Sequence, residues 1–149
     1  MAEVWFYHLT ESRLEDALPA LLEKTLERGW RAVVEFGSEE RLNQMNEHLW
    51  TWRDDAFLPH GTAADGFEAD QPVYLTLDAA NPNAAQARFH VDGSMPHDVS
   101  PYIRAILMFD GHDNGQLDAA RSQWKRLKGE GHDVSYWKQM PDRRWQKQM

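Results

Sequence analysis

Short apolar runs alternate along the chain with segments in which leucines and other apolar residues recur at helical spacing. The runs are rich in β-branched and aromatic residues, which favours strands, and they cover residues 3–9, 31–36, 72–77, 87–91, 103–110 and 132–138. Helical spacing occurs between them, at residues 11–28, 39–52 and 116–128. Strands and helices that alternate through short connections predict parallel strands and right-handed crossovers. We therefore expect an α/β fold, a three-layer α/β/α domain whose mainly parallel sheet has helices on both faces.

Individual residues mark where the predicted helices begin and end. Pro19 interrupts the first leucine stripe. We therefore predict a short turn followed by a longer helix that begins at Pro19, where the missing N–H costs nothing. Gly29 is expected to end that helix, and two glycines shortly after residue 128 are expected to end the third. Ser38 is the predicted N-cap of the second helix, with two acidic residues after it in the first turn.

Length and composition limit the class of protein. A chain of 149 residues is a usual length for one domain, here residues 1–149, with residues 141–149 expected as a tail. The sequence has no cysteine, which excludes disulfides, a thiolate nucleophile and a cysteine-based zinc site. No basic N-terminal segment precedes a long apolar run, so we expect a soluble, cytoplasmic protein without a signal peptide or membrane span.

Charge is distributed unevenly along the chain. Residues 121–149 hold eight Lys and Arg against three Asp and Glu, a net charge of +5. Residues 1–120 hold eight Lys and Arg against 21 Asp and Glu, a net charge of −13, and the whole chain carries −8. A local basic face on an acidic protein favours capture of a short acidic segment over the coating of a long nucleic acid.

The helix predicted at residues 116–128 carries the beginning of that basic region. Its apolar side is formed by Leu117, Ala120, Trp124 and Leu127. An adjacent side presents three cations, Arg121, Lys125 and Lys128. One interpretation is a binding surface that combines cations with an indole ring. The other is an ordinary surface helix, with Trp124 in the core and the cations solvated.

The sequence lacks the common signatures of catalytic and nucleotide-binding sites. No GxGxxG follows the first strand and no GxxxxGK[ST] occurs, so dinucleotide and nucleotide binding are not expected. The FDGHD segment that contains Asp110–Asp113 lacks the HxxxH or HExxH spacing of a helical metal site, and no GxSxG elbow is present. We therefore expect no catalytic residue, no metal and no cofactor. Two alternatives stay open: a small metal- or nucleotide-dependent hydrolase that uses the Asp110–Asp113 loop, and a direct nucleic-acid binder that uses the basic C-terminus.

A series of short motifs occurs in a fixed order along nearly the whole chain. They are FYHL (Phe6–Leu9), RGWRAVV (Arg28–Val34), LW (Leu49 and Trp50), FLPHG (Phe57–Gly61), QPVYL (Gln71–Leu75), FD (Phe109 and Asp110), ARSQWK (Ala120–Lys125) and GHDVSYW (Gly131–Trp137). Their order resembles that of the chi subunit family of bacterial DNA polymerase III holoenzyme.

The resemblance implies a non-enzymatic accessory subunit of the clamp-loader complex. Members of the family bind the acidic, hydrophobic C-terminal tail of single-stranded-DNA-binding protein, and the psi subunit links them to the clamp loader. The partner-binding residues that the resemblance implies here are Trp50, Phe57, Arg121, Trp124, Lys125 and Tyr136. An arginine fork suits a terminal carboxylate, and an apolar slot suits the aromatic residue of the tail. Because the chain is acidic overall, we expect no direct contact with nucleic acid, and none with a membrane.

Two departures from the family pattern affect the expected partners. Members of the family carry a lysine one turn before the arginine of the ARSQWK motif, and Leu117 stands at that place here. Residues 92–101 are shorter and more irregular, with Pro96 and Pro101 where a helix is expected. Docking of psi is the less uniform property of the family, so the resemblance supports the tail more strongly than psi as a partner.

Overall fold

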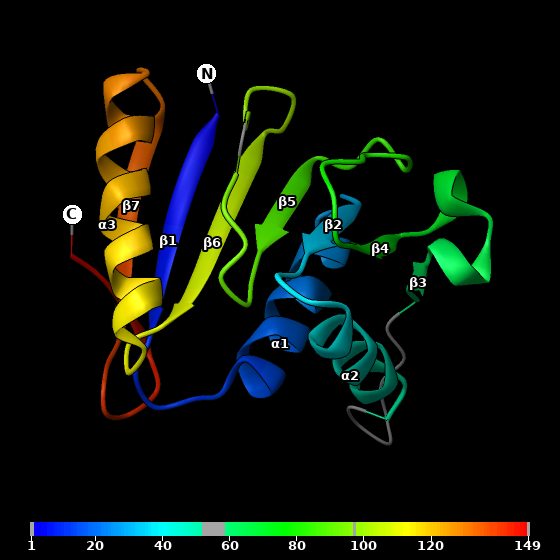
Figure 1. Ribbon diagram of the computed structural model, residues 1–149, viewed down its shortest axis with the longest axis horizontal. Helices are drawn as coiled ribbons and strands as arrows, with labels where there is room; N and C mark the ends of the chain where they lie inside the picture. Colours follow the sequence, from blue (N-terminus) through cyan, green and yellow to red (C-terminus); the bar gives the residue numbers. More distant parts are fainter. Residues whose placement is uncertain (1, 52–58, 97, 149) are drawn as a thin grey trace.

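The computed structural model describes residues 2–51, 59–96 and 98–148, which form one eight-stranded sheet with helices on both faces (Figure 1). The strands are β1 (Glu3–Leu9), β2 (Ala32–Glu35), β3 (Gly61–Thr62), β4 (Val73–Thr76), β5 (Ala87–His90), β6 (Arg104–Asp110), β7 (Asp133–Gln139) and β8 (Trp145–Lys147). The helices are α1 (Leu14–Glu27), α2 (Glu39–Trp50) and α3 (Asn114–Gly129), with two 3-10 turns, η1 (Ala63–Asp65) and η2 (Glu68–Asp70).

The sheet has the strand order β3-β4-β2-β5-β6-β1-β7-β8. Neighbouring strands pair in parallel except β7 and β8, so the predicted mainly parallel α/β fold is confirmed. The chain leaves β1 through α1 toward β2, and it leaves β6 through α3 toward β7, on the other side of β1. Figure 1 shows the result: α3 lies along β1 and β7 at one end of the sheet, and α1 and α2 lie toward the other end.

Each face of the sheet has its own apolar core because successive side chains of a strand point to opposite faces. In β1, Tyr7 and Leu9 pack in the core beneath α1 and α2, while Val4 and Phe6 pack in the core beneath α3. The three layers of the predicted architecture are therefore present. No helix in the described part of the chain is both long enough and apolar enough to cross a membrane.

A buried polar network lies on β2 and β5 on the face that carries α3. Arg88 donates to the Glu35 carboxylate at 2.5 Å and to the Tyr102 hydroxyl at 3.0 Å. Ser94 donates to the same carboxylate and lies 3.1 Å from His90 Nδ1. The network joins the two strands to the irregular segment around residues 92–102, where the sequence already indicated that a helix of the family pattern is replaced by loop.

The expected break in the first helix is wrong. α1 runs from Leu14 to Glu27 with Pro19 inside it. A proline inside a helix leaves one carbonyl without its donor, and His48 of α2 supplies that donor to Glu15. The N-cap role of Ser38 is confirmed, since its side chain accepts from the N–H of Arg41 at 3.3 Å.

The other ends of the helices and of the chain follow the prediction in part. Gly29 has φ +80° just after α1, as its predicted stop role requires. After α3 only Gly131 adopts such a value, φ +90°, while Gly129 is the last residue of the helix. The segment expected as a tail contains β8, and Trp145 packs on Tyr7 with ring centroids 4.6 Å apart.

Candidate partner-binding site

A hollow of about 320 Å³ lies between α3 and the ends of three strands, and we call it the α3 pocket. Its walls come from β1, β6, β7 and α3, and its lining residues are His8, Phe109, Leu117, Ala120, Arg121, Trp124, Lys125 and Tyr136. The lining combines an apolar floor with two cations at the rim. Such a hollow can hold an apolar side chain and an anionic group of the same ligand.

The start of α3 is fixed by residues of the FDGHD segment. Asp113 is the N-cap, and its carboxylate accepts from the N–H of Gln116 at 3.1 Å. Asp110 accepts from the N–H of His112 at 2.8 Å. A Cβ on Gly111 would collide with the His8 ring, so glycine is needed where β6 ends beside β1. This segment therefore positions α3 over the pocket.

Trp124 forms part of both the core and the pocket. Its indole is half-buried and meets the Phe6 ring edge-on at 5.5 Å and the Tyr136 ring at 6.0 Å between centroids. Lys128 Nζ lies 5.5 Å from the centroid of the indole ring. Trp124 thus anchors the helix and also lines the hollow, and the interpretation of this helix as a binding surface stays a prediction.

The cations of α3 differ in how firmly they are held. Arg121 has a side chain that is 74% exposed, and its ion pair with Asp118 spans 3.6 Å between two exposed groups. An exposed pair of this kind contributes little, so the guanidinium can turn toward a ligand at small cost. Arg126 is tied down: it donates to Glu130 at 2.8 Å and to the carbonyl of Pro96 at 2.9 Å. Arg126 therefore fastens the 92–102 segment to α3.

His8 and Tyr136 form a polar pair at the back of the pocket. His8 Nδ1 and the Tyr136 hydroxyl oxygen are hydrogen-bonded at 2.5 Å. Burial lowers the pKa of His8, and the positive charges of Lys138, His112 and Arg121 lower it further, against a smaller opposite effect of Asp110. Burial raises the pKa of Tyr136, which Arg121 partly offsets. Both groups are therefore neutral at neutral pH, and the positive charge of the pocket comes from α3.

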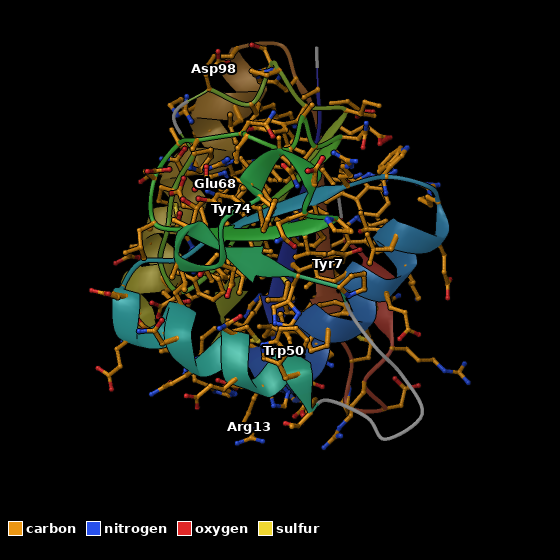
Figure 2. The ribbon with its side chains drawn as sticks, turned by 90° about the vertical axis from the view of Figure 1, so that its right-hand side faces the viewer. Tyr7, Arg13, Trp50, Glu68, Tyr74 and Asp98 are labelled. Atoms are coloured by element: carbon orange, nitrogen blue, oxygen red, sulfur yellow. The ribbon has the colours of Figure 1, made fainter. Side chains whose placement is uncertain are left out.

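The structure brings together four of the six partner-binding residues expected from the sequence. Arg121, Trp124, Lys125 and Tyr136 all line the α3 pocket. Trp50 does not: it lies at the end of α2, 52% exposed, with its ring 4.4 Å from that of His60 (Figure 2). α2 belongs to the core on the other face of the sheet. Phe57 lies outside the described residues.

Four lining residues were not predicted as part of a site: His8, Phe109, Leu117 and Ala120. The alternation of β1 carries a signal for one of them, because His8 shares the face of Val4 and Phe6. Phe109 has the matching position on β6, opposite His8 in the register. Nothing in the sequence alone states which strand ends lie beside α3, so the set could not be assembled before the fold was known.

The residues of the alternative catalytic sites have structural roles. His112 Nε2 lies 2.9 Å from the carbonyl oxygen of Thr10, and Asp113 is the N-cap of α3. Within the described residues, no group of three or more His, Asp or Glu side chains is placed so that it could hold a metal ion.

The fold and the pocket define an α/β protein with a basic, aromatic hollow beside a surface helix. The chain belongs to a known family, because the model of the family "DNA polymerase III chi subunit, HolC" matches residues 1–135. The resemblance inferred from the order of the motifs is therefore confirmed.

Two relatives agree with that assignment. A protein of Rickettsia prowazekii (strain Madrid E), "Probable DNA polymerase III subunit chi", is 31% identical over 85 residues. That match spans 57% of this chain and 52% of the relative, about half its length. The "DNA polymerase III subunit chi" of Haemophilus influenzae (strain ATCC 51907 / DSM 11121 / KW20 / Rd) is 23% identical over 134 residues, which is 87% of this chain and 92% of the relative.

Proposed function

We propose that this chain is a non-catalytic adaptor of the DNA replication machinery. It binds the acidic C-terminal tail of single-stranded-DNA-binding protein and, through a psi-type subunit, links that protein to the clamp-loader complex of DNA polymerase III. The observation that carries the proposal is the α3 pocket, in which the exposed guanidinium of Arg121 stands at the rim of an apolar floor. Membership of the chi subunit family supports the same function.

The pocket matches the two chemical features of such a tail. A terminal carboxylate and neighbouring aspartates favour the fork of Arg121 and the ammonium of Lys125, which form charge-assisted hydrogen bonds and ion pairs. The aromatic side chain near the end of the tail favours the apolar floor, which includes Phe109, Leu117 and Trp124. Each feature alone would bind weakly, and their combination selects a segment that is both acidic and apolar.

The charge of the chain as a whole supports the same partner. A net charge of −8 repels bare phosphate, whereas the local basic surface of α3 attracts an acidic segment. An adaptor with this distribution binds a protein that is on DNA without binding the DNA itself.

The proposal is tested by a tryptophan fluorescence titration with a peptide that carries the acidic tail of the cognate single-stranded-DNA-binding protein. Saturable binding that weakens with salt and needs the free terminal carboxylate is expected. Arg121→Ala should weaken binding by roughly 1–3 kcal/mol, the scale for losing a hydrogen bond to a charged group. The matched control is Arg13→Ala. Arg13 is also exposed (77%) and also pairs with an aspartate three residues away, but it lies at the start of α1 and not on α3.

The outcomes separate the pocket from a general effect of charge. Equal affinity of wild type and Arg121→Ala, or equal weakening by Arg121→Ala and Arg13→Ala, would remove the assignment of the α3 pocket. Absence of binding at low salt would remove the proposed partner and leave the fold and the family unchanged.

A further inference from the structure

A second hollow, of about 350 Å³, lies at the opposite edge of the sheet, and we call it the β4 groove. It is formed where β4 ends, where α2 begins and where β3 leads into η1. Its lining residues are Glu39, Leu42, Asn43, Thr62, Ala63, Ala64, Tyr74, Leu75, Thr76, Leu77 and Asp78. Figure 2 looks onto this edge of the molecule, with Tyr74 of β4 and Glu68 of η2 labelled.

The floor of the groove is apolar and its mouth is open. Leu42 and Leu75 are buried, and each belongs to the core between α2 and the sheet. Leu77 follows β4 directly and is 47% exposed, which makes it one of few large apolar side chains left in water among the described residues. An exposed leucine beside an apolar hollow provides an anchoring surface for an apolar side chain of a partner.

The charge around the groove is of one sign. Two carboxylates, those of Glu39 and Asp78, belong to the lining, and the lining contains no lysine or arginine. Arg88 donates to the carbonyl of Asp78 from behind, but it is 3% exposed and its charge is paired with Glu35.

We propose that the β4 groove docks a cationic amphipathic segment of a partner protein. The apolar side chains of that segment lie on Leu42, Leu75 and Leu77, and its lysine or arginine residues face Glu39 and Asp78. This is the inverse of the α3 pocket, in which cations surround the apolar floor. Amphipathic segments bind apolar grooves in this way, and complementary charge sets their orientation and selects against acidic competitors.

The two surfaces do not overlap. They share no lining residue, and β2 and β5 lie between the strands that build the groove and those that build the pocket. Both can therefore be occupied at the same time. The inference goes beyond the proposed function and does not depend on it, because it needs no acidic tail.

The test uses a short fluorescein-labelled peptide of leucine and lysine, with the leucines at helical spacing. Its binding to the protein is measured by fluorescence anisotropy at low salt. Leu77→Lys removes the apolar anchor and adds a positive charge that repels the cationic peptide, so it should weaken peptide binding at least about tenfold. Ile103→Lys is the matched control, since Ile103 is 52% exposed, lies just before β6 outside the groove lining, and changes the net charge by the same amount. Affinity of that control should stay within about twofold of wild type.

A second variant and a map of the peptide-binding residues test the groove independently if Leu77→Lys lowers the melting temperature of the protein. Glu39→Gln removes one exposed carboxylate and should weaken binding about two- to fivefold, with a smaller dependence on salt. Hydrogen–deuterium exchange should show protection by the peptide at residues 39–43, 62–64 and 74–78. Arg121→Ala should bind the peptide as wild type does, which separates a failure of the groove from a failure of the α3 pocket.

Several results would overturn the inference. One is equal weakening by Leu77→Lys and Ile103→Lys, which would mean attraction by net charge alone. Others are equal affinity for a leucine–glutamate peptide of the same spacing, or protection of residues 117–125 in place of the groove. Concentration-dependent dimerisation that Leu77→Lys abolishes would assign the groove to a second copy of this chain instead.

Discussion

His48 on α2 supplies the hydrogen bond that Pro19 cannot give to its own helix. In an α-helix the N–H of residue 19 would donate to the carbonyl of Glu15, and proline has no N–H. His48 Nε2 lies 2.6 Å from that carbonyl oxygen and donates to it in place of the missing amide. Pro19 therefore leaves the carbonyl of Glu15 free to accept a hydrogen bond from α2, and this hydrogen bond joins α1 to α2.

This relationship predicts a coupling between the two residues. His48→Ala should destabilise the wild-type protein by about 1–2 kcal/mol, because it leaves a carbonyl oxygen without its partner. In a Pro19→Ala background the alanine N–H can donate to Glu15, so the same substitution should cost clearly less. A double-mutant cycle from urea unfolding measures the difference, and strictly additive effects would contradict the account.

A second prediction concerns Glu35 in the buried polar network. Burial opposes its ionisation, but His90, whose Nδ1 lies 3.7 Å from the carboxylate, and hydrogen bonds from Ser94 and Arg88 outweigh that effect and lower its pKa from 4.5 to about 2. A carboxylate whose pKa is lower in the folded state stabilises the fold above pH 4.5, and this contribution is lost as the pH falls toward 2. Glu35→Gln should therefore cost roughly 3 kcal/mol at pH 7, because it leaves the buried Arg88 charge unpaired.

The pH dependence distinguishes this effect from simple loss of packing. The difference in unfolding free energy between wild type and Glu35→Gln should shrink when urea titrations are repeated between pH 4.5 and pH 3. Glu27→Gln, at the exposed end of α1, is the control and should differ little from wild type at either pH. A difference for Glu35→Gln that is constant with pH would show that its charge is not what stabilises the network.

His8 should give stability a pH dependence near neutrality. Its folded pKa lies below the ordinary 6.5, so acidification below that value protonates the unfolded chain first and favours unfolding. His8→Phe should lower the free energy of unfolding by about 1 kcal/mol at pH 7, because the hydrogen bond to Tyr136 is lost. The difference in unfolding free energy between this variant and wild type should be smaller at pH 5. Tyr136→Phe removes the same hydrogen bond and keeps His8, so its difference in unfolding free energy from wild type should change less with pH. Equal slopes for both variants would contradict this prediction.

Leu117 offers a test of the proposed tail-binding pocket in the direction of gain. Leu117 lines the pocket one turn before Arg121, at the place where the resemblance to the family implies a lysine. Leu117→Lys removes a leucine from the apolar floor, but the lysine stem still covers apolar surface and its ammonium adds a third cation to the pocket. The added charge should dominate at low salt, where binding of an acidic peptide should tighten by about three- to tenfold, with a smaller gain at high salt. Ser122→Lys adds the same charge to the exposed part of α3 outside the pocket lining and should have less effect. A gain of the same size in both variants would show that only net charge matters.

The sequence was sufficient to predict the class of fold because local patterns agree with it. Helical and strand periodicities, short connections and the Ser38 cap all indicate alternating elements, and the structure has them. The sequence pattern does not show two of the strands, because β3 has two residues and β8 has three, too few for any periodicity to appear. The helix break predicted at Pro19 is wrong because the compensating donor, His48, lies far along the chain, and a rule based on neighbouring residues does not include it.

The candidate site was predictable to the extent that it lies on one helix. Spacing on α3 puts Arg121, Trp124 and Lys125 side by side, and the structure places Tyr136 next to them. Trp50 was grouped with them by resemblance alone, and the structure places it on the helix that covers the other face of the sheet. Whether two elements share a face depends on strand order, and strand order is not a local property of the sequence.

The position of β1 in the sheet has a consequence for how the chain is made. β1 begins at residue 3, yet its two neighbours are β6, which starts at residue 104, and β7, which starts at residue 133. β1 is therefore synthesised before both of its neighbours, and its edges have no pairing partner until β6 and β7 have been made. Because these pairings join strands that are far apart in the sequence, we expect this part of the sheet to close late in folding.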